Sequence, residues 1–356
     1  MLSVVLLVVA SFAGVGGGSQ AFADAADVTF GVQPSTATGP DGRERFDFNV
    51  APSTVISDWV AVTNSSTSEI TVRLVGEDAT TDYGSGEFTL VGTDVPSTDI
   101  GAWTSVNGEA STCPDITADQ AQACLPTLGA AVRLQPGEQA NVPFTLTVPA
   151  DATPGDHAGG IAAIYTTTQP GSDGISTPVE VHVGTRVYLR VDGPVSPGMT
   201  MSGLVSGYDG GWNPFDGTAR VSFDLANAGN SRVSAATSVV VKGPFGLGRH
   251  EWQLADTKNL MPGKTAHITA DLEGVPAWLL LFADVTVTPL AADGTAASDP
   301  LPDAVTASTM TWAVPWTILG AIVVVAGVVL LVRWRRRERR LLDEALAAAQ
   351  TQQPAN

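Results

Sequence analysis

The sequence predicts an all-β ectodomain of two tandem β-sandwiches, followed by one transmembrane helix. Three observations lead to this prediction. Between residues 26 and 290, apolar residues alternate in short runs bounded by Gly, Pro, Asn and Asp, which is the pattern of β-strands. Two stretches within this region match each other in motif and in order. Residues 313–332 carry no charge over 20 positions, enough for a helix to cross a bilayer.

Residues 1–23 are predicted to be a signal peptide. The segment begins almost wholly apolar, and Ala21, Ala23 and Ala25 offer two ways of meeting the A-x-A cleavage pattern. We therefore expect the mature chain to begin near Asp24. No basic residue occurs within the segment, although signal peptides normally start with one. We interpret it as a signal peptide whose start lies upstream. An N-terminal anchor and a start codon placed too late are the alternatives.

The internal match indicates two related domains. The stretches LQPGEQANVPFTLTVP, from Leu134, and LMPGKTAHITADLEGVP, from Leu260, share the pattern L-x-P-G-x-x-A-x-V/I-x-x-x-L and end on Val-Pro. The Pro-Gly pair makes a tight turn that leads into a strand. Each stretch is preceded by a strand, an Asn-containing turn and another strand, with Asn64 and Asn227 at the turns. Such repeats are typical of immunoglobulin-like sandwiches.

We expect these immunoglobulin-like domains over residues 26–195 and 196–290, with a boundary in the segment 192–199. The Asn turn precedes the proline of the Pro-Gly pair by 72 residues in the first copy and by 35 in the second. The first domain therefore carries an insertion of about 37 residues within 78–131. Long insertions in small domains are usually functional or disordered. This insertion is the leading candidate for a recognition surface.

The insertion contains the only cysteines of the chain, Cys113 and Cys124. Ten residues separate them, and in an exported segment this spacing predicts a local disulfide. Free thiols are the alternative. A loop of this size contributes on the order of 3 kcal/mol in the chain-entropy picture. Two cysteines without a nearby histidine do not make a zinc site.

The residues 313–332 are predicted to form a transmembrane helix. Trp312 and Trp316 stand at one edge as interfacial aromatics, and the run RWRRRERR follows at the other. By the positive-inside rule, the tail 333–356 is cytoplasmic and the rest of the chain is outside the cell. A buried core helix would not be followed by this block of arginines. The Ala-, Asp- and Pro-rich segment 291–312 is expected to be an extended stalk.

Charge is distributed unevenly. The whole chain has a net charge of −18, but the tail holds six basic and three acidic residues. The remaining 12 basic and 33 acidic residues give the region between residues 24 and 312 a net charge of −21. A region this acidic repels nucleic acid and anionic lipid, so nucleic-acid binding is excluded. The expected location is the cell membrane, with a single span.

The stretch GDHAGGIAAIY (155–165) raises the possibility of catalysis, because His157 follows an aspartate. None of the H-E-x-x-H, G-x-S-x-G, S-x-x-K or Walker patterns occurs in the sequence. Gly159 and Gly160 stand at the entrance of a strand that continues with Ile161, where glycines permit a bulge or the close approach of a neighbour. We interpret the stretch as structural, and predict that the chain is not an enzyme and has no cofactor.

Two other kinds of site were weighed. The acidic loops 76–87 and 207–217 lack the alternate spacing of a calcium loop, so we expect solvated turns and no metal site. Tyr83 and Trp103 lie in or near the insertion, in polar and turn-rich surroundings. Flat aromatic faces stack on sugar rings, which makes these two residues candidate ligand contacts.

The order of these parts resembles the WxL-interacting protein family of Gram-positive cell surfaces. The resemblance is carried by LQPGEQANVPFTLTVP, by the G-G-I strand at Gly159, Gly160 and Ile161, and by VGTRVYLRVDGP. It implies an N-terminal peptidoglycan-binding domain and a second domain that binds a host or partner protein, without assigning any binding residue. The disulfide-bearing insertion departs from the family. The Ala-, Asp- and Arg-rich, Lys-poor composition indicates an actinobacterial-type member.

The sequence thus leads us to expect a non-enzymatic, membrane-anchored cell-surface adaptor. Its expected partners are cell-wall peptidoglycan, a secreted surface protein, or both. The alternatives are a cell-wall-active hydrolase and a structural stalk without a specific ligand. Paired carboxylates in a cleft, or a serine in contact with a histidine, would favour the hydrolase.

Overall fold

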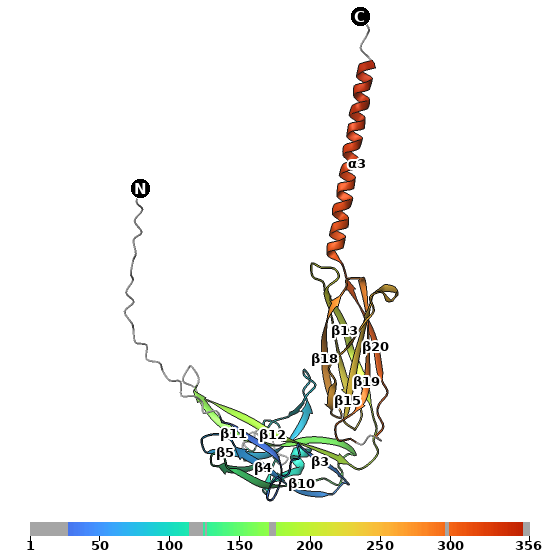
Figure 1. Ribbon diagram of the computed structural model, residues 1–356. Helices are drawn as coiled ribbons and strands as arrows, with labels where there is room; N and C mark the ends of the chain where they lie inside the picture. The colour runs from blue at the N-terminus through green and yellow to red at the C-terminus, as the bar shows by residue number, and fades with distance from the viewer. Residues whose placement is uncertain (1–27, 114–123, 125–126, 171–175, 296–298, 352–356) are drawn as a thin grey trace, which may run out of the picture.

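The computed structural model describes residues 28–113, 124, 127–170, 176–295 and 299–351 (Figure 1). The predicted signal peptide, residues 1–23, lies outside them. The described chain is mostly β, with sandwich-like sheets and one long C-terminal helix. The prediction of an all-β region followed by an apolar helix is confirmed at that level.

The first half of the strand region, Phe30–Val191, forms two sheets around a common core. Its elements are β1 Phe30–Thr36, β2 Gly39–Pro40, β3 Phe46–Val50, β4 Val55–Asn64, β5 Ile70–Thr81, β6 Phe88–Leu90, α1 Ile100–Trp103, β7 Thr104–Val106, β8 Glu109–Ala110, β9 Ala130–Leu134, β10 Gln139–Thr147, β11 Gly155–Pro170 and β12 Ser176–Val191. One sheet has the order β2-β1-β4-β10-β7-β8 and the other β3-β12-β11-β5-β6, with β9 beside β5.

The alternation of apolar and polar residues along the strands determines which side chains form the core of the first half. On β10, the side chains of Val142, Phe144 and Leu146 are buried, and the residues between them are more exposed. This is the period of two that a strand with one buried face requires. The Phe144 ring meets Phe46 of the opposite sheet edge-on, with centroids 5.0 Å apart. Side chains of both sheets therefore interlock in one apolar cluster.

The second half, Met199–Ala313, repeats this arrangement with fewer strands. Its elements are β13 Met199–Asp209, β14 Gly217–Asn227, β15 Val233–Lys242, the short 3-10 turn η2 Pro244–Gly246, β16 His250–Gln253, β17 Thr257–Leu260, β18 Thr265–Val275, β19 Leu279–Ala291 and β20 Val305–Ala313. The sheets are β13-β14-β18 and β16-β15-β19-β20, with β17 beside β15. A second apolar cluster lies between them, including Val221, Phe223 and Leu225 on β14.

The two asparagine turns have matching hydrogen bonds. The Nδ2 atom of Asn64 donates to the carbonyl oxygens of Ser68 and Leu134, at 2.8 and 3.1 Å. The Nδ2 atom of Asn227 donates to the carbonyl oxygens of Ser231 and Leu260, at 2.8 and 2.9 Å. In each half, the glycine of the Pro-Gly pair also has a positive φ and donates its N–H to the carbonyl oxygen of the asparagine. The sequence match thus has a counterpart in backbone geometry.

The insertion predicted within 78–131 is built onto both sheets of the first half. Its β7 pairs with β10 and its β6 pairs with β5. The carboxylate of Asp78 accepts hydrogen bonds from the backbone N–H groups of Thr98, Asp99 and Gly101, and so holds the start of α1. The predicted disulfide between Cys113 and Cys124 is confirmed, with Cα atoms 6.1 Å apart.

The prediction of an extended stalk over residues 291–312 is wrong from residue 305 onward. β20 (Val305–Ala313) pairs with β19 along its whole length and completes the last sheet. The segment contains four β-branched residues and a tryptophan but no Gly or Pro, so its strand propensity outweighs the composition of the residues before it. The helix α3, Trp316–Thr351, accordingly begins at Trp316 and not at residue 313. Its segment Trp316–Leu341 is long and apolar enough to cross a membrane.

Candidate functional site

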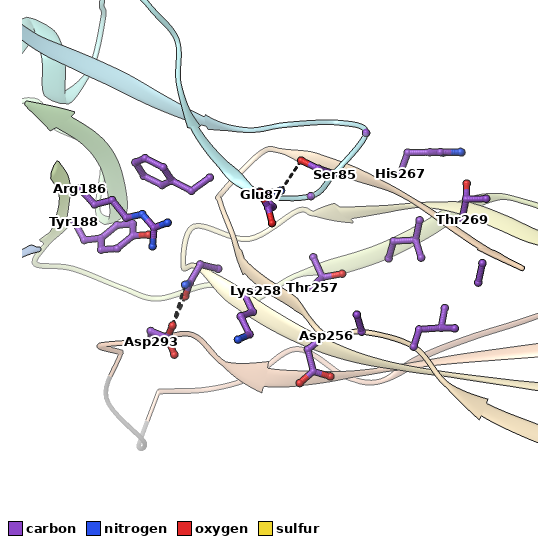
Figure 2. A pocket seen from close by; sticks show the side chains of 18 residues that line it. Ser85, Glu87, Arg186, Tyr188, Asp256, Thr257, Lys258, His267, Thr269 and Asp293 are labelled. Atoms are coloured by element: carbon purple, nitrogen blue, oxygen red, sulfur yellow. Dashed lines mark hydrogen bonds between the residues drawn. The ribbon is translucent and has the colours of Figure 1, made fainter. Parts of the chain in front are cut away.

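A cleft of about 750 Å³ lies where the two halves meet (Figure 2). Its walls come from both halves: residues 84–88, Arg186 and Tyr188 from the first, and residues 254–259, residues 267–270 and Asp293 from the second. Clefts between packed units are common binding sites because side chains from both can converge on a ligand.

The loop between β5 and β6 forms one wall of the cleft. The carboxylate of Asp82 accepts hydrogen bonds from both the N–H and the hydroxyl of Ser85, each at 2.7 Å. Gly86 closes the turn with a φ of 72°, which a side chain would disfavour. The carbonyl oxygen of Tyr83 accepts a hydrogen bond of 2.6 Å from the N–H of His267 on β18. This backbone hydrogen bond joins the tip of the loop to β18, the edge strand of one sheet of the second half.

Tyr83 was a predicted ligand contact, and the structure places it in a contact between the halves. Its hydroxyl donates to the carboxylate of Asp224 at 2.7 Å, and Nδ1 of His267 lies 2.7 Å from the same oxygen. The rings of Tyr83 and His267 are stacked, with centroids 5.4 Å apart. The hydrogen bonds from His267 and Tyr83 lower the pKa of Asp224. With 53 % of Tyr83 exposed, its use as a ligand contact stays a prediction.

Trp103, the other predicted contact, lies away from the cleft lining. It packs against the first core and its ring is tilted against His157, with centroids 4.9 Å apart. The structure therefore does not bring Trp103 together with Tyr83 in one site. Its indole is better described as part of the packing between α1 and β11.

His157 has a structural environment. Its Nδ1 atom lies 2.8 Å from a carboxylate oxygen of Asp99, and its Nε2 atom lies 2.8 Å from the carbonyl oxygen of Thr153. Burial opposes a charge on the ring, but the hydrogen bond and the charge of Asp99, the carbonyl oxygen of Thr153 and the charge of Asp156 together outweigh it and raise the pKa of His157. The histidine therefore ties the start of α1 to the start of β11.

The two glycines after His157 permit close contacts with the insertion. A Cβ atom on Gly159 would lie 2.4 Å from the side chain of Ile100, and one on Gly160 would lie 2.8 Å from Leu90. Such distances are well inside van der Waals contact. Ile161, the next residue, is fully buried in the first core. Of the two roles expected for these glycines, a bulge or the close approach of a neighbour, the contacts correspond to the second, and the glycines lie inside β11 and not at its entrance.

Sequence reasoning missed a buried charge cluster beside the cleft. The Asp156 carboxylate, 1 % exposed, accepts hydrogen bonds from Nε and Nη2 of Arg190 at 2.7 and 2.9 Å. It also accepts the backbone N–H of Arg232, from the second half, at 2.7 Å. Burial raises the pKa of Asp156, but its contacts with the two arginines outweigh this and lower it. In the sequence, Asp156, Arg190 and Arg232 are single charges in three separate segments, so nothing there indicates that they meet.

The same cluster reaches the cleft through Tyr188. The guanidinium carbon of Arg232 lies 3.8 Å from the centre of the Tyr188 ring, a cation–π contact in a buried setting. Gly155, just before Asp156, has a φ of 120°, and a Cβ atom there would lie 2.1 Å from the carbonyl oxygen of Asn230. The two halves thus contact each other closely on both sides of the cleft.

The lining of the cleft is polar and carries both charges. Glu87, Asp256 and Asp293 supply carboxylates, and Arg186 and Lys258 supply cations (Figure 2). Asp293 exchanges hydrogen bonds with Asn259. No group of three or more potential metal-ligating side chains occurs in the part of the chain that the structure describes. The arrangement suits a polar ligand with hydroxyl, amide and carboxylate groups.

No protein-family model and no curated protein matches the sequence. Among solved structures, the chain is similar to the class 5 fimbriae chaperone CfaA, with a TM-score of 0.34 and 11 % identity over 81 % of this chain and 100 % of that chain. It is also similar to the Pseudomonas aeruginosa CupB2 chaperone, with a TM-score of 0.31 and 13 % identity over 77 % and 99 % of the two chains. Similarity of this size carries no inference about function.

Proposed function

We propose that the chain is a non-enzymatic, membrane-anchored cell-surface adaptor that binds cell-wall peptidoglycan through the cleft between its halves. A secreted surface protein is a second partner consistent with the same role. The cleft is the observation that carries the proposal, because it is a large polar concavity formed by both halves and bordered by their mutual contacts.

The architecture proposed for this role is two tandem immunoglobulin-like domains of the WxL-interacting type. Support comes from the matched hydrogen bonds of Asn64 and Asn227 and from the separate apolar clusters of the halves. Anchoring is supported by the apolar first part of α3 and by the six arginines at positions 333–340 of the same helix. The disulfide is consistent with an oxidising compartment outside the cell. We therefore place the strand region outside and the tail in the cytoplasm.

The ligand chemistry follows from the cleft lining. Peptidoglycan offers sugar hydroxyls, amides and the carboxylates of its peptides. Lys258 and Arg186 are suited to these carboxylates, whereas Glu87 and Asp256 can accept hydrogen bonds from hydroxyl and amide groups. Lys258 is exposed on the cleft wall and therefore available to a ligand.

The test is sedimentation of the detergent-solubilised full chain with insoluble peptidoglycan at moderate salt. We expect the wild type to pellet and the Lys258→Ala variant to bind about tenfold more weakly, the size of one charged hydrogen bond. Lys264→Ala is the matched control, because Lys264 is an exposed lysine in the turn after β17 and does not line the cleft. It should bind as the wild type does.

Other outcomes separate the alternatives. Wild-type protein that stays in the supernatant contradicts peptidoglycan binding and leaves a protein partner or a stalk role. Release of soluble muropeptides during incubation favours a hydrolase, for which the cleft carboxylates of Glu87, Asp256 and Asp293 would be the candidate groups. Equal loss in the two lysine variants points to unspecific charge attraction and contradicts recognition in the cleft.

A further inference from the structure

The end of the second half next to α3 exposes a set of large apolar side chains. The strand register places three loops at this end. The end of β20, Ala313, lies opposite the start of β19, Leu279, and the end of β15, Lys242, lies opposite Phe282 in the same part of β19. In the other sheet, the end of β13, Asp209, lies opposite Thr218 at the start of β14. The loops after β13, β15 and β18 therefore share the end at which the chain enters α3 (Figure 1). Six large apolar side chains on these loops and at the adjacent ends of β19 and β20 are exposed. We call this set the apolar platform: Trp212, Phe215, Phe245, Leu247, Leu279 and Trp312.

The exposure of these side chains is unusual. Trp212 is 90 % exposed, Phe245 is fully exposed, and Phe215 and Trp312 are 64 % and 68 % exposed. Single exposed apolar residues are common on soluble proteins, but a group of aromatic residues at one end of a domain marks an interaction surface. Leaving such area in water is unfavourable, and burying it elsewhere would be favourable.

The backbone holds two of these side chains outward at a cost in free energy. Phe245 and Leu279 have φ angles of 58° and 70°, in the left-handed region that bulky residues avoid. Non-glycine residues persist there only when the surroundings fix the conformation, and such residues cluster at functional surfaces. Here the N–H of Gly243 donates to the carbonyl oxygen of Leu247 at 2.7 Å across the loop.

Packing between the loops makes the apolar platform rigid. The Trp278 side chain fills the space beside two glycines of the neighbouring loop, where a Cβ atom on Gly243 or Gly248 would lie 2.7 or 2.5 Å from it. The N–H of Ala277 donates to the carbonyl oxygen of Pro214 at 2.8 Å, which joins two of the three loops. The exposed side chains are therefore held by a fixed framework.

The link to α3 fixes the height of this end above a membrane. Only Val314 and Pro315 separate the end of β20 from the first residue of α3. Three Cα–Cα steps span at most about 11 Å between Ala313 and Trp316. When α3 crosses a bilayer from Trp316 onward, the loops at this end lie at the level of the lipid headgroups. No other surface of the second half is placed there by the chain.

We infer that the apolar platform inserts into the interfacial layer of the bilayer that α3 crosses, and so holds the second half upright on the membrane. The inference rests on the proposed anchoring by α3. Trp and Phe side chains favour this layer, because it accommodates large apolar rings next to water. Charges of both signs lie at the same end, Asp209 and Asp216 as well as Lys242 and Arg249, so insertion depends on apolar contact and not on charge.

The experiment uses the full chain in phosphatidylcholine nanodiscs. Because the two native cysteines are joined in a disulfide, one introduced cysteine can carry a single nitroxide label. Phe245→Cys and Phe215→Cys place the label on two loops of the apolar platform. Lys264→Cys is the control at the opposite end of the second half, and Val325→Cys reports on α3. Accessibility to oxygen and to a water-soluble nickel complex measures the depth of each label.

The measured quantity is the ratio of accessibility to oxygen over accessibility to the nickel complex, which rises with depth in the bilayer. We expect this ratio to be several-fold higher for the labels at 245 and 215 than for the label at 264. The label at 325 should be the deepest. Labels at 245 and 215 that match the one at 264, with 325 in lipid, overturn the inference and leave anchoring intact. A label at 325 that is open to nickel contradicts anchoring itself. Strong spin–spin broadening at 245 identifies a second copy on the platform and also overturns the inference.

Discussion

The Asp156 carboxylate and the Arg190 guanidinium form a two-point ion pair on neighbouring strands, and both groups reach the second half. The Nη2 atom of Arg190 donates to the hydroxyl of Ser231 at 3.0 Å, and its Nη1 atom donates to the carboxylate of Asp299. Asp156 accepts the backbone N–H of Arg232, and the Nε atom of Arg232 lies 3.6 Å from the same carboxylate. Arg190 has a second carboxylate partner in Asp299, whereas Asp156 is the one carboxylate found beside Arg232 among the described residues. The side chains of Arg190 and Arg232 are 17 % and 5 % exposed. The geometry between the halves depends on this group.

Replacement of Asp156 with asparagine should therefore affect stability and shape together. The substitution leaves Arg232 without a carboxylate beside it, while Arg190 keeps Asp299. Removing one partner of a buried ion pair in this way costs about 3–5 kcal/mol. We expect Asp156→Asn to lower the free energy of unfolding by about this amount. We also expect a larger radius of gyration by small-angle X-ray scattering, because the halves are less firmly joined. Asp271→Asn, which breaks the exposed pair with Arg220, is the control and should change neither quantity. An Asp156→Asn variant as stable as the control would contradict the role of this cluster.

The matched asparagines give a paired prediction. Asn64 and Asn227 are 0 % and 1 % exposed, and each satisfies carbonyl oxygens that have no other side-chain partner in their turn. We expect Asn64→Ala and Asn227→Ala each to lower the free energy of unfolding by about 1–3 kcal/mol. Chemical denaturation followed by circular dichroism measures this change. The exposed Asn49→Ala is the control. If only one of the two variants is destabilised, the turns are not equivalent.

Gly159 tests the contact between β11 and the insertion. A Cβ atom there would lie 2.4 Å from Ile100 and 2.6 Å from the carbonyl oxygen of Glu77, so the backbone itself must move. We expect Gly159→Ala to destabilise the chain by about 1–3 kcal/mol, as overpacking does. Thermal unfolding provides the measurement. Gly31→Ala on β1 is the matched control, because no atom lies within 4 Å of the added group. Equal melting temperatures for the two variants would count against close packing of the insertion.

The ion pair of His157 with Asp99 gives a dependence on pH. The pKa of His157 is raised from its ordinary value of 6.5, so the folded state binds the proton more tightly than the unfolded state. The stabilisation is fully present below pH 6.5 and is lost as the pH rises through the higher pKa of the folded state. We expect the stability difference between wild type and His157→Gln to shrink over that range. Exposed His250→Gln is the control. A difference that grows with pH would have the wrong sign.

Much of the fold could be predicted because its signals are local. Alternation fixes which face of β10 or β14 is buried, and the Pro-Gly and Asn turns repeat at positions that the structure finds equivalent. The disulfide also follows from spacing and compartment. The stalk was misassigned because composition was averaged across a loop and a strand, whereas β20 by itself has a strand pattern.

The cleft could not be predicted, because its walls come from segments far apart in the chain. Nothing in the sequence near Asp156 indicates that Arg232 lies beside it, since that contact depends on how the halves pack. Tyr83 was chosen for its polar surroundings, and those surroundings are in fact the edge of the other half. The apolar platform was missed for the same reason, because its members lie on separate loops and only strand register gathers them.

The pairing of β20 with β19 determines how the protein would carry mechanical force. A pull between a wall-bound ligand and the membrane enters the second half through α3 and runs along β20, nearly parallel to its axis (Figure 1). The force then acts in shear on all the hydrogen bonds between β19 and β20, from the pair Leu279 and Ala313 to the pair Val287 and Val305. Because these bonds share the load, they cannot open one after another. A strand in this position opposes extension through its hydrogen bonds, whereas an extended stalk has no cross-strand hydrogen bonds to do so. On the proposed function, the second half would transmit tension between a wall-bound ligand and the membrane through this pair of strands.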